Sequence, residues 1–182
     1  MNTVMKAALL TLAFAASFSA GAKDLSVSDM NDLPISQVAI VHSLAGEGLN
    51  AFVKRVAPQF VAFTATTGYE ACGMIGVRES DGVTNGAFSI TIGTVGSHIG
   101  CQVGPVEAGF VSMNRTVHSH PQSHSIRLSA VDMKVRGTPA GKLRTEYLDN
   151  CHFSPQDYSA PGFLISCGKI QYQHGVGTAK EI

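Results

Sequence analysis

Apolar side chains recur at helical spacing near the start of the chain and predict a helix over residues 35–56. The apolar stripe comprises Val38, Val41, Leu44 or Ala45, Leu49, Phe52, Val53 and Val56. Gly46 and Gly48 fall within this range and mark a kink or break. We expect Pro58 to end the helix, because proline removes a backbone hydrogen-bond donor. Residues 59–66 would then form a strand or continue the same packing surface.

From Cys72 onward the pattern becomes that of β-strands. Three short runs of β-branched and other apolar residues lie at 73–77, 87–93 and 109–117. Turn signals separate the runs, at Asp81-Gly82, Asn85-Gly86 and Gly104-Pro105. We expect the third run to lead directly into His118 and His120. Residues 163–172 are expected to form a closing strand before a short polar tail.

Residues 126–148 show a further alternation. Apolar Val131, Met133 and Val135 alternate with polar Asp132, Lys134 and Arg136. Residues 137–141 read Gly-Thr-Pro-Ala-Gly and would turn the chain, after which residues 143–147 alternate again. Because period-two alternation is typical of half-buried strands, we predict an inserted β-hairpin here. Residues 23–182 contain no internal repeat or low-complexity linker and are expected to form one α+β domain.

The first 22 residues have the three parts of a secretory signal peptide. Lys6 supplies a positive region, residues 7–18 are apolar, and Ala20-Gly21-Ala22 is a small-residue cleavage site. The mature chain would begin at Lys23 and reside in the periplasm or outside the cell. No later apolar run approaches the roughly 18 residues that a membrane helix needs, so we expect no membrane span.

The charge balance bears on the possible partners. The chain carries 13 basic and 13 acidic residues, so its formal net charge is zero. Nucleic acids and anionic membranes attract proteins through clustered positive charge. We therefore expect neither as a partner.

The strongest candidate chemistry lies in His118-Ser119-His120, which is followed at once by Pro121. Alternate side chains of a strand point to opposite faces, so both imidazoles would lie on the same side. Neutral imidazole is the usual histidine ligand of zinc. The motif thus indicates a site for one small cation.

A second candidate segment, residues 154–157, reads Ser-Pro-Gln-Asp and has the pattern of a helix start. Ser154 would be the N-cap and Pro155 the first helical residue, with an acid in the first turn. This start would direct Asp157 toward the cation as an oxygen ligand. Two histidines and one carboxylate leave a fourth position for water, as hydrolytic zinc sites require.

Three segments taken in order resemble the JAB/MPN domain in its metal-binding (JAMM) form. They are E-A-C-G at 70–73, H-S-H-P at 118–121 and S-P-Q-D at 154–157. With the P-G-F-L run at 161–164, the resemblance is closest to the JAMM-like domains of bacterial polymorphic-toxin proteins. It covers about residues 67–175. It implies an MPN/JAB-like (cytidine-deaminase-like) mixed β-sheet flanked by helices, here with the inserted hairpin.

The resemblance also implies roles for individual residues. Zn²⁺ would be held by His118, His120 and Asp157. Glu70 would be the general base, taking a proton from metal-activated water without binding zinc itself. Ser154 would hydrogen-bond the oxyanion that develops on the attacked carbonyl.

Asp132 is an alternative third ligand, because residues 129–132 also read S-x-x-D. Eight residues separate His120 from Ser129 and 33 separate it from Ser154, and neither spacing matches family members with a short connection. We prefer Asp157, whose context resembles the toxin-associated subgroup. Asp132 is expected to face solvent from a strand of the hairpin.

The four cysteines are expected to be oxidised in an exported protein. Four cysteines allow three pairings, and the sequence alone does not choose among them. We favour Cys151–Cys167, because it would close a loop around the segment that holds Asp157, with Cys72–Cys101 as its complement. No C-x-x-C occurs, which argues against a zinc ribbon or thioredoxin-type site. An alternative in which Cys72 is a nucleophile is disfavoured because exported thiols are mostly oxidised.

Taken with the export signal, the resemblance implies an exported zinc-dependent hydrolase of peptide or isopeptide bonds. Extracytoplasmic peptides would be the substrates, with peptidoglycan cross-links as one conjecture. Two alternatives stay open: a non-catalytic MPN-type binding or scaffold module, and a secreted interbacterial effector with the same chemistry. The sequence carries no information on the oligomeric state.

Overall fold

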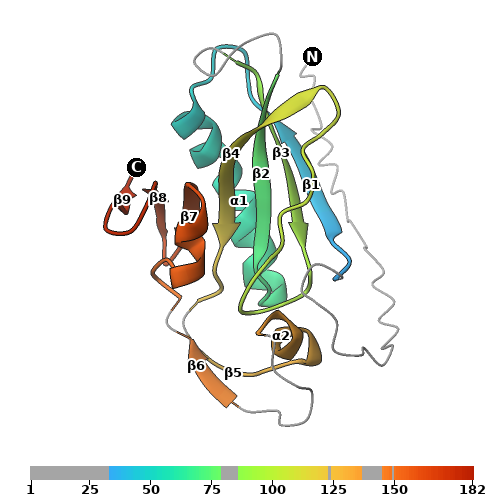
Figure 1. Cartoon of the computed structure of the whole chain (residues 1–182), viewed down its shortest axis with the longest axis vertical. Coiled ribbons are helices and arrows are strands. Elements are labelled where there is room, and N and C mark those ends of the chain that lie inside the picture. The colour runs from blue at the N-terminus through green and yellow to red at the C-terminus, as the bar shows by residue number, and fades with distance from the viewer. Residues whose placement is uncertain (1–32, 79–85, 123, 137–144, 149) are drawn as a thin grey trace, which may run out of the picture.

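The computed structural model describes residues 33–78, 86–122, 124–136, 145–148 and 150–182. These residues form an α+β fold, as expected, built on a mixed seven-stranded sheet and a separate two-stranded sheet (Figure 1). The large sheet has the order β1-β3-β2-β4-β7-β8-β9, and the small one pairs β5 with β6. The strands of the large sheet are β1 (Ser36–His42), β2 (Ala71–Arg78), β3 (Phe88–Thr94), β4 (Phe110–Ser119), β7 (Gly162–Ser166), β8 (Lys169–Gln173) and β9 (Lys180–Glu181). The remaining elements are helix α1 (Leu49–Thr67), strand β5 (His124–Arg127), helix α2 (Ala130–Val135), strand β6 (Thr145–Leu148) and the 3-10 helix η2 (Pro155–Ser159).

Helix α1 lies against one face of the large sheet and closes the main core (Figure 1). Its apolar stripe meets inward-facing residues of the central strands. The cluster includes Phe52, Val53, Val56 and Phe60 from the helix and Ile75, Ile90, Ile92, Val117 and Phe163 from the sheet. Each such burial contributes about 1.5–3 kcal/mol relative to an exposed side chain. The opposite face of the sheet is thereby left for the candidate site.

The predicted helix over 35–56 is wrong in its first half. Ser36–His42 forms β1, an edge strand paired antiparallel with β3. Both faces of this run are apolar, since Ala39 and Val41 pack on the core while Val38 and Ile40 are exposed. That composition imitates a helical stripe, but Gly46, with φ of +71°, breaks the chain before the helix begins at Leu49.

The predicted end at Pro58 is also wrong, because Pro58 lies inside α1. An internal proline costs about 3 kcal/mol. Pro58 is exposed, as is Lys54, whose carbonyl loses its partner, while neighbouring Ala57 and Phe60 are buried. Their burial offsets the cost, and the helix ends instead at Gly68, whose left-handed backbone lets its N–H reach the carbonyl of Thr64 at 2.8 Å.

The three strands predicted between residues 73 and 117 are confirmed as β2, β3 and β4. The single closing strand is wrong: residues 163–172 form the hairpin β7–β8. Cys167 and Gly168 both have positive φ, which suits a tight two-residue turn. The tail adds β9 beside β8.

The inserted hairpin is correct only in part. Strands β5 and β6 pair antiparallel, but the alternating residues before residue 136 form helix α2. Ser129 caps this helix, and its hydroxyl accepts a hydrogen bond from the backbone N–H of Asp132 at 3.1 Å. A cap of this kind starts a helix whatever the alternation that follows. Residues 137–144, with the predicted turn, lie outside the described part of the chain.

Two further predictions fall on residues that are not described. They are the signal segment 1–22 and the turn signals that begin at residues 81 and 85. Among the described residues, no helix combines the length and hydropathy needed to cross a membrane.

Candidate metal centre

The end of β4 carries both histidines on one face of the large sheet. His118 lies opposite Cys72 on β2 and Leu164 on β7, so the strand is held on both sides. The N–H of His120 continues the ladder to the carbonyl of Ile165 at 3.2 Å. The two imidazole centroids are 4.9 Å apart, as expected for side chains at i and i+2.

Ser119, between the histidines, points to the opposite face. Its hydroxyl lies 2.6 Å from the hydroxyl of Thr64 on α1, and it accepts from the N–H of Ala71 at 3.2 Å. This buried contact ties β4 to the helix behind it. In the three-residue motif, the two histidines therefore lie on the face of the candidate site, and the serine lies on the face toward α1.

Helix η2 brings Asp157 to the histidines. Asp157 Oδ1 lies 3.4 Å from His118 Nε2, and Oδ2 lies 3.9 Å from His120 Nε2. The carboxylate is fixed by the N–H of Ser154, which donates to Oδ2 at 2.6 Å. One potential ligand atom from each of the three residues lies within 4.8 Å of the others. The structure thus brings together the three residues that the sequence motifs favoured as ligands.

The ring nitrogens of His118 and His120 have the hydrogen-bonding pattern that is typical of metal ligands. His118 Nε2 is buried and has no hydrogen-bond partner within the described ranges. An unpaired buried polar atom costs about 1–3 kcal/mol, so a nitrogen without a hydrogen-bond partner beside a carboxylate is suited to bind a cation. His120 Nδ1 lies 3.1 Å from the carbonyl of Asn150, and donating to it leaves the Nε2 lone pair facing the same space.

The protonation states also fit a cation. Burial lowers the pKa of His120 to about 4, helped by the neighbouring His118, so this ring is neutral at neutral pH. Burial alone would raise the pKa of Asp157, but the adjacent His118 ring and the backbone N–H of Ser154 outweigh it and lower the pKa to about 2. A neutral imidazole and an ionised carboxylate are the forms that bind zinc.

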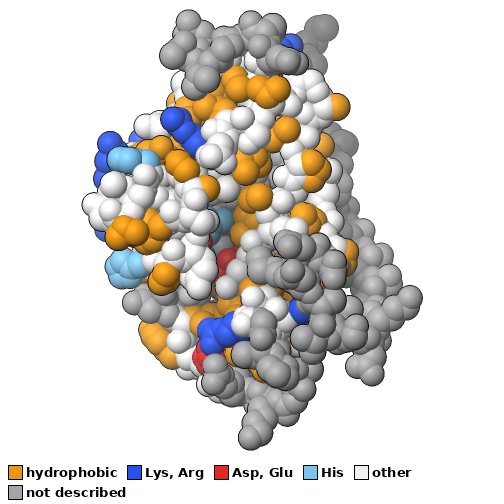
Figure 2. Space-filling model, in the orientation of Figure 1, with side chains coloured by type: hydrophobic (Ala, Val, Ile, Leu, Met, Phe, Trp, Pro, Cys, Tyr) orange, Lys and Arg blue, Asp and Glu red, His pale blue; other side chains and the backbone are white. Residues whose placement is uncertain are grey.

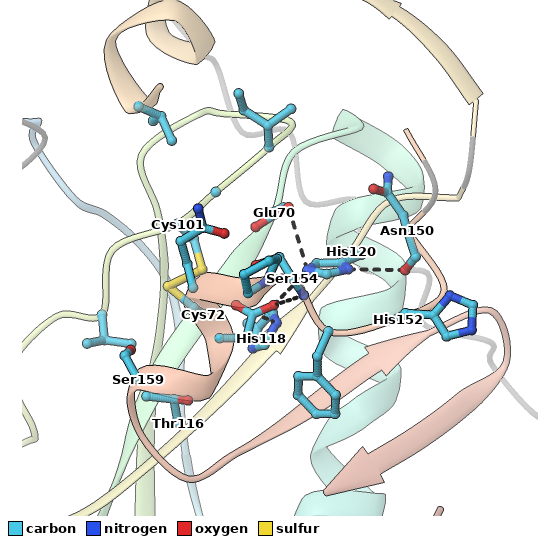
Figure 3. Close-up of a pocket in the computed structure, with 18 of the residues that line it drawn as sticks. Glu70, Cys72, Cys101, Thr116, His118, His120, Asn150, His152, Ser154 and Ser159 are labelled. Carbon is cyan, nitrogen blue, oxygen red and sulfur yellow. Dashed lines mark hydrogen bonds and ion pairs between the residues drawn. A yellow bond between two sulfur atoms is a disulfide. The ribbon is translucent and has the colours of Figure 1, made fainter. Parts of the chain in front are cut away.

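Glu70 lies at the edge of this cluster and is 6% exposed. Its Oε1 is 3.9 Å from His120 Nε2, and Figure 3 shows its side chain beside the histidines. Burial raises the pKa of Glu70 well above its ordinary value, and the charges of Asp157 and Asp132 add to the effect. Its backbone is held by the carbonyl of Ser97 at 2.8 Å. Glu70 is therefore a buried carboxyl group beside the three candidate ligands.

A cavity of about 950 Å³ opens over the cluster. Figure 2 shows a hollow in this face, with histidine and acidic side-chain atoms at its floor. Ser154 lines it, as does the Cys72–Cys101 disulfide (Figure 3). The lining also includes residues from the loop after β3 and from the insert, namely Ile99, Val103, Val135, Arg136 and Leu148.

Asp132 does not join the histidines, and its expected solvent exposure is wrong. It is fully buried at the start of α2. Its carboxylate accepts from the hydroxyl of Ser97 at 2.7 Å, and from the N–H of His98 and the N–H of Ser129, each at 2.7 Å. Burial would raise the pKa of Asp132, but these donors outweigh it and lower the pKa. Asp132 is a structural anchor between the insert and the loop beside Glu70.

Both expected disulfides are present, Cys72–Cys101 and Cys151–Cys167. No cysteine is left free, so the alternative of a Cys72 nucleophile is wrong. Two disulfides fit a protein of the periplasm or the extracellular space.

Sequence reasoning missed the carbonyl of Asn150, which faces His120 Nδ1 and is next to Cys151. Every residue has a carbonyl, and no motif marks this one.

No protein-family model, curated protein or solved structure matches the chain in the three comparisons. The arguments about function therefore rest on the motifs and on the geometry of the site.

Proposed function

We propose that the protein is an exported zinc-dependent hydrolase of peptide or isopeptide bonds, built on an MPN/JAB-like fold. The observation that carries the proposal is the buried, unpartnered Nε2 of His118, which faces Asp157 beside His120. A scaffold module has no physical reason to keep a bare nitrogen next to a carboxylate. The order of the motifs along the chain, with Glu70 first, supports the same reading.

The roles follow from the positions of the side chains. His118, His120 and Asp157 would hold the ion, and Asn150 would orient His120 through its carbonyl. When bound, zinc would supply Lewis acidity and lower the pKa of a water ligand to about 7.

Proton transfer would fall to Glu70. Its Oε1 would accept the proton of the attacking water and return it to the leaving nitrogen of the amide. Burial raises the pKa of Glu70, which makes its ionised form a stronger base for this proton. Ser154 would donate its hydroxyl to the developing oxyanion from the wall of the cavity.

Metal analysis of the purified mature protein tests the proposal. We expect about one zinc per chain, lost in His118→Ala. His152→Ala is the matched control, because His152 lines the same cavity but lies outside the ligand group and should keep its zinc. A parent protein that binds no zinc even after reconstitution would favour the scaffold alternative.

The second test separates metal binding from chemistry. Glu70→Gln should keep zinc and the fold yet lose about 10²–10⁴-fold in turnover. Peptide and isopeptide substrates, including cross-linked muropeptides, would be offered to parent and variant with and without a chelator. Equal chelator-sensitive turnover in the two proteins would remove Glu70 from the mechanism.

A further inference from the structure

The cavity over the candidate metal centre has one positively charged side chain among the described residues that line it. That residue is Arg136, the C-cap of α2. The acidic residues of the lining, Glu70 and Asp157, belong to the metal cluster. The lining of the cavity thus combines two carboxyl groups that lie near the histidines with one guanidinium group.

The guanidinium of Arg136 is held in place by Glu146 on β6. Nη1 donates to Glu146 Oε1 at 2.7 Å and lies 2.5 Å from Oε2. Within the described ranges, Nε and Nη2 make no hydrogen bond, so these two donors stay available. The side chain is 35% exposed, so a ligand can reach it. A guanidinium fixed at one nitrogen and open at two others can bind a carboxylate with paired hydrogen bonds.

Apolar side chains form part of the cavity wall. They are Ile99, Val103, Leu148 and Val135, and Val135 directly precedes Arg136 in the chain. Val135 is packed closely, because a Cβ placed on Gly100 would come within 2.7 Å of it. An apolar wall lowers the local dielectric and strengthens the attraction between an arginine and an anion.

We propose that Arg136 binds a carboxylate of the substrate and selects for amide or isopeptide substrates that carry one. The uncleaved part of the substrate would lie along the apolar wall, with its carboxylate paired to the guanidinium. Glu146 would support Arg136 without being required for the contact with the substrate carboxylate. The inference rests on the proposed hydrolase function, since it takes the metal cluster as the reacting end of the cavity.

Binding measurements on the zinc-loaded protein test this without relying on turnover. The probes are alkyl hydroxamates of increasing chain length that end in a carboxylate, each paired with its methyl ester. The hydroxamate binds zinc, and the ester keeps the length of the probe while removing the charge. At one or two chain lengths we expect the acid to bind about tenfold more tightly than the ester.

Two variants separate a carboxylate site from a structural ion pair. Arg136→Gln should bring acid and ester to equal affinity. Glu146→Gln is the matched control, because it breaks the same ion pair but keeps the cation, and it should retain most of the preference. Equal binding of acid and ester by the parent at every length would overturn the inference. The inference would also be overturned if Arg136→Gln still bound the acid more tightly than the ester. The same holds if Glu146→Gln abolished this preference as completely as Arg136→Gln does.

Further arms of the experiment distinguish the source of the carboxylate and the cause of a failure. At the preferred length, one probe carries the carboxylate as the C-terminus of an added alanine. Another carries it as an aspartate side chain with an amidated C-terminus. If the neutral esters fail to bind the zinc-loaded protein, or zinc cannot be loaded, the proposed metal centre fails and this inference falls with it. Tight but unselective binding of the esters would refute the role of Arg136 alone.

Discussion

The two Ser-x-x-Asp segments of this chain share a local structure but meet different surroundings. Asp132 and Asp157 each stand three residues after a serine and accept a hydrogen bond from the backbone N–H of that serine. Asp132 is fully buried and is also bonded by Ser97 and His98. Asp157 keeps an oxygen 3.4 Å from the bare nitrogen of His118. The same capping motif thus serves as an anchor where the chain supplies donors opposite it, and as a candidate ligand where the chain supplies imidazoles.

The largest difference should appear in stability. Asp132→Asn replaces a carboxylate that faces several buried donors, and we expect it to lower the free energy of unfolding by about 3–5 kcal/mol. Urea unfolding with a chelator present and the disulfides intact would measure this. Asp157→Asn, whose side chain is 20% exposed, should cost the metal-free protein less, about 1–2 kcal/mol. Equal losses in the two variants would mean that both aspartates are anchors.

Zinc affinity should show the reverse order. Asp157→Asn removes a proposed ligand, so its affinity should fall by at least the roughly 10–100-fold that loss of an outer-shell partner costs. The part of Asp132→Asn that remains folded should bind zinc within a few-fold of the parent. Competition with a chromophoric chelator would give both constants. Loss of zinc in Asp132→Asn alone would exchange the roles that we assign to the two aspartates.

The disulfides provide a third way to separate the two segments. Cys151–Cys167 brackets the Asp157 segment, and Asn150, next to Cys151, holds both His120 and the hydroxyl of Ser166. Replacing both cysteines with serine should weaken zinc binding by about tenfold. The reason is that the disulfide next to Asn150 no longer holds the carbonyl that orients His120.

The matched control for this test is the Cys72→Ser/Cys101→Ser double variant, which removes a disulfide from the wall of the same cavity. It should leave zinc affinity nearly unchanged, with thermal unfolding recorded for both variants. An equal loss of affinity in the two double variants would attribute the effect to general loosening of the chain.

The smallest expected effect concerns pH. The pKa of Asp132 is lower in the folded chain than in the unfolded one, so its ionised form stabilises the fold. This contribution is fully present above about pH 4, the unfolded value, and is lost as the pH falls through the folded value. The stability difference between the metal-free parent and Asp132→Asn should therefore be constant near neutrality and shrink below about pH 4. A difference that does not change in acid would mean that the charge of Asp132 adds nothing to stability.

Local signals predicted the arrangement of the three candidate ligands better than they predicted the elements around them. The placement of His118 and His120 follows from strand alternation, and the direction of Asp157 follows from a capping motif three residues long. Both signals act over a few residues and need no tertiary information. The same local reasoning could not choose between Asp132 and Asp157, because the choice depends on which donors the folded chain brings opposite each carboxylate.

The errors in the fold have a common physical origin. Residues 36–42 are apolar on both faces, so periodicity could not separate an edge strand from the adjoining helix. Pro58 is tolerated because of buried neighbours that only the folded sheet supplies. In α2 the cap at Ser129 prevails over an alternation that spans only six residues. In each case tertiary packing or capping decided between two local patterns.

The position of β4 between β2 and β7 has a consequence for how such a site could be altered. His118 is paired on both sides, so shifting it by one residue would break two ladders and turn its side chain toward α1. Asp157 and Arg136 instead stand on short helices outside the sheet. Segments of that kind can be exchanged without disturbing the strands. Grafting different η2 or α2 segments onto this sheet is therefore a practical route to change the third ligand or the substrate preference while the two imidazoles stay in place.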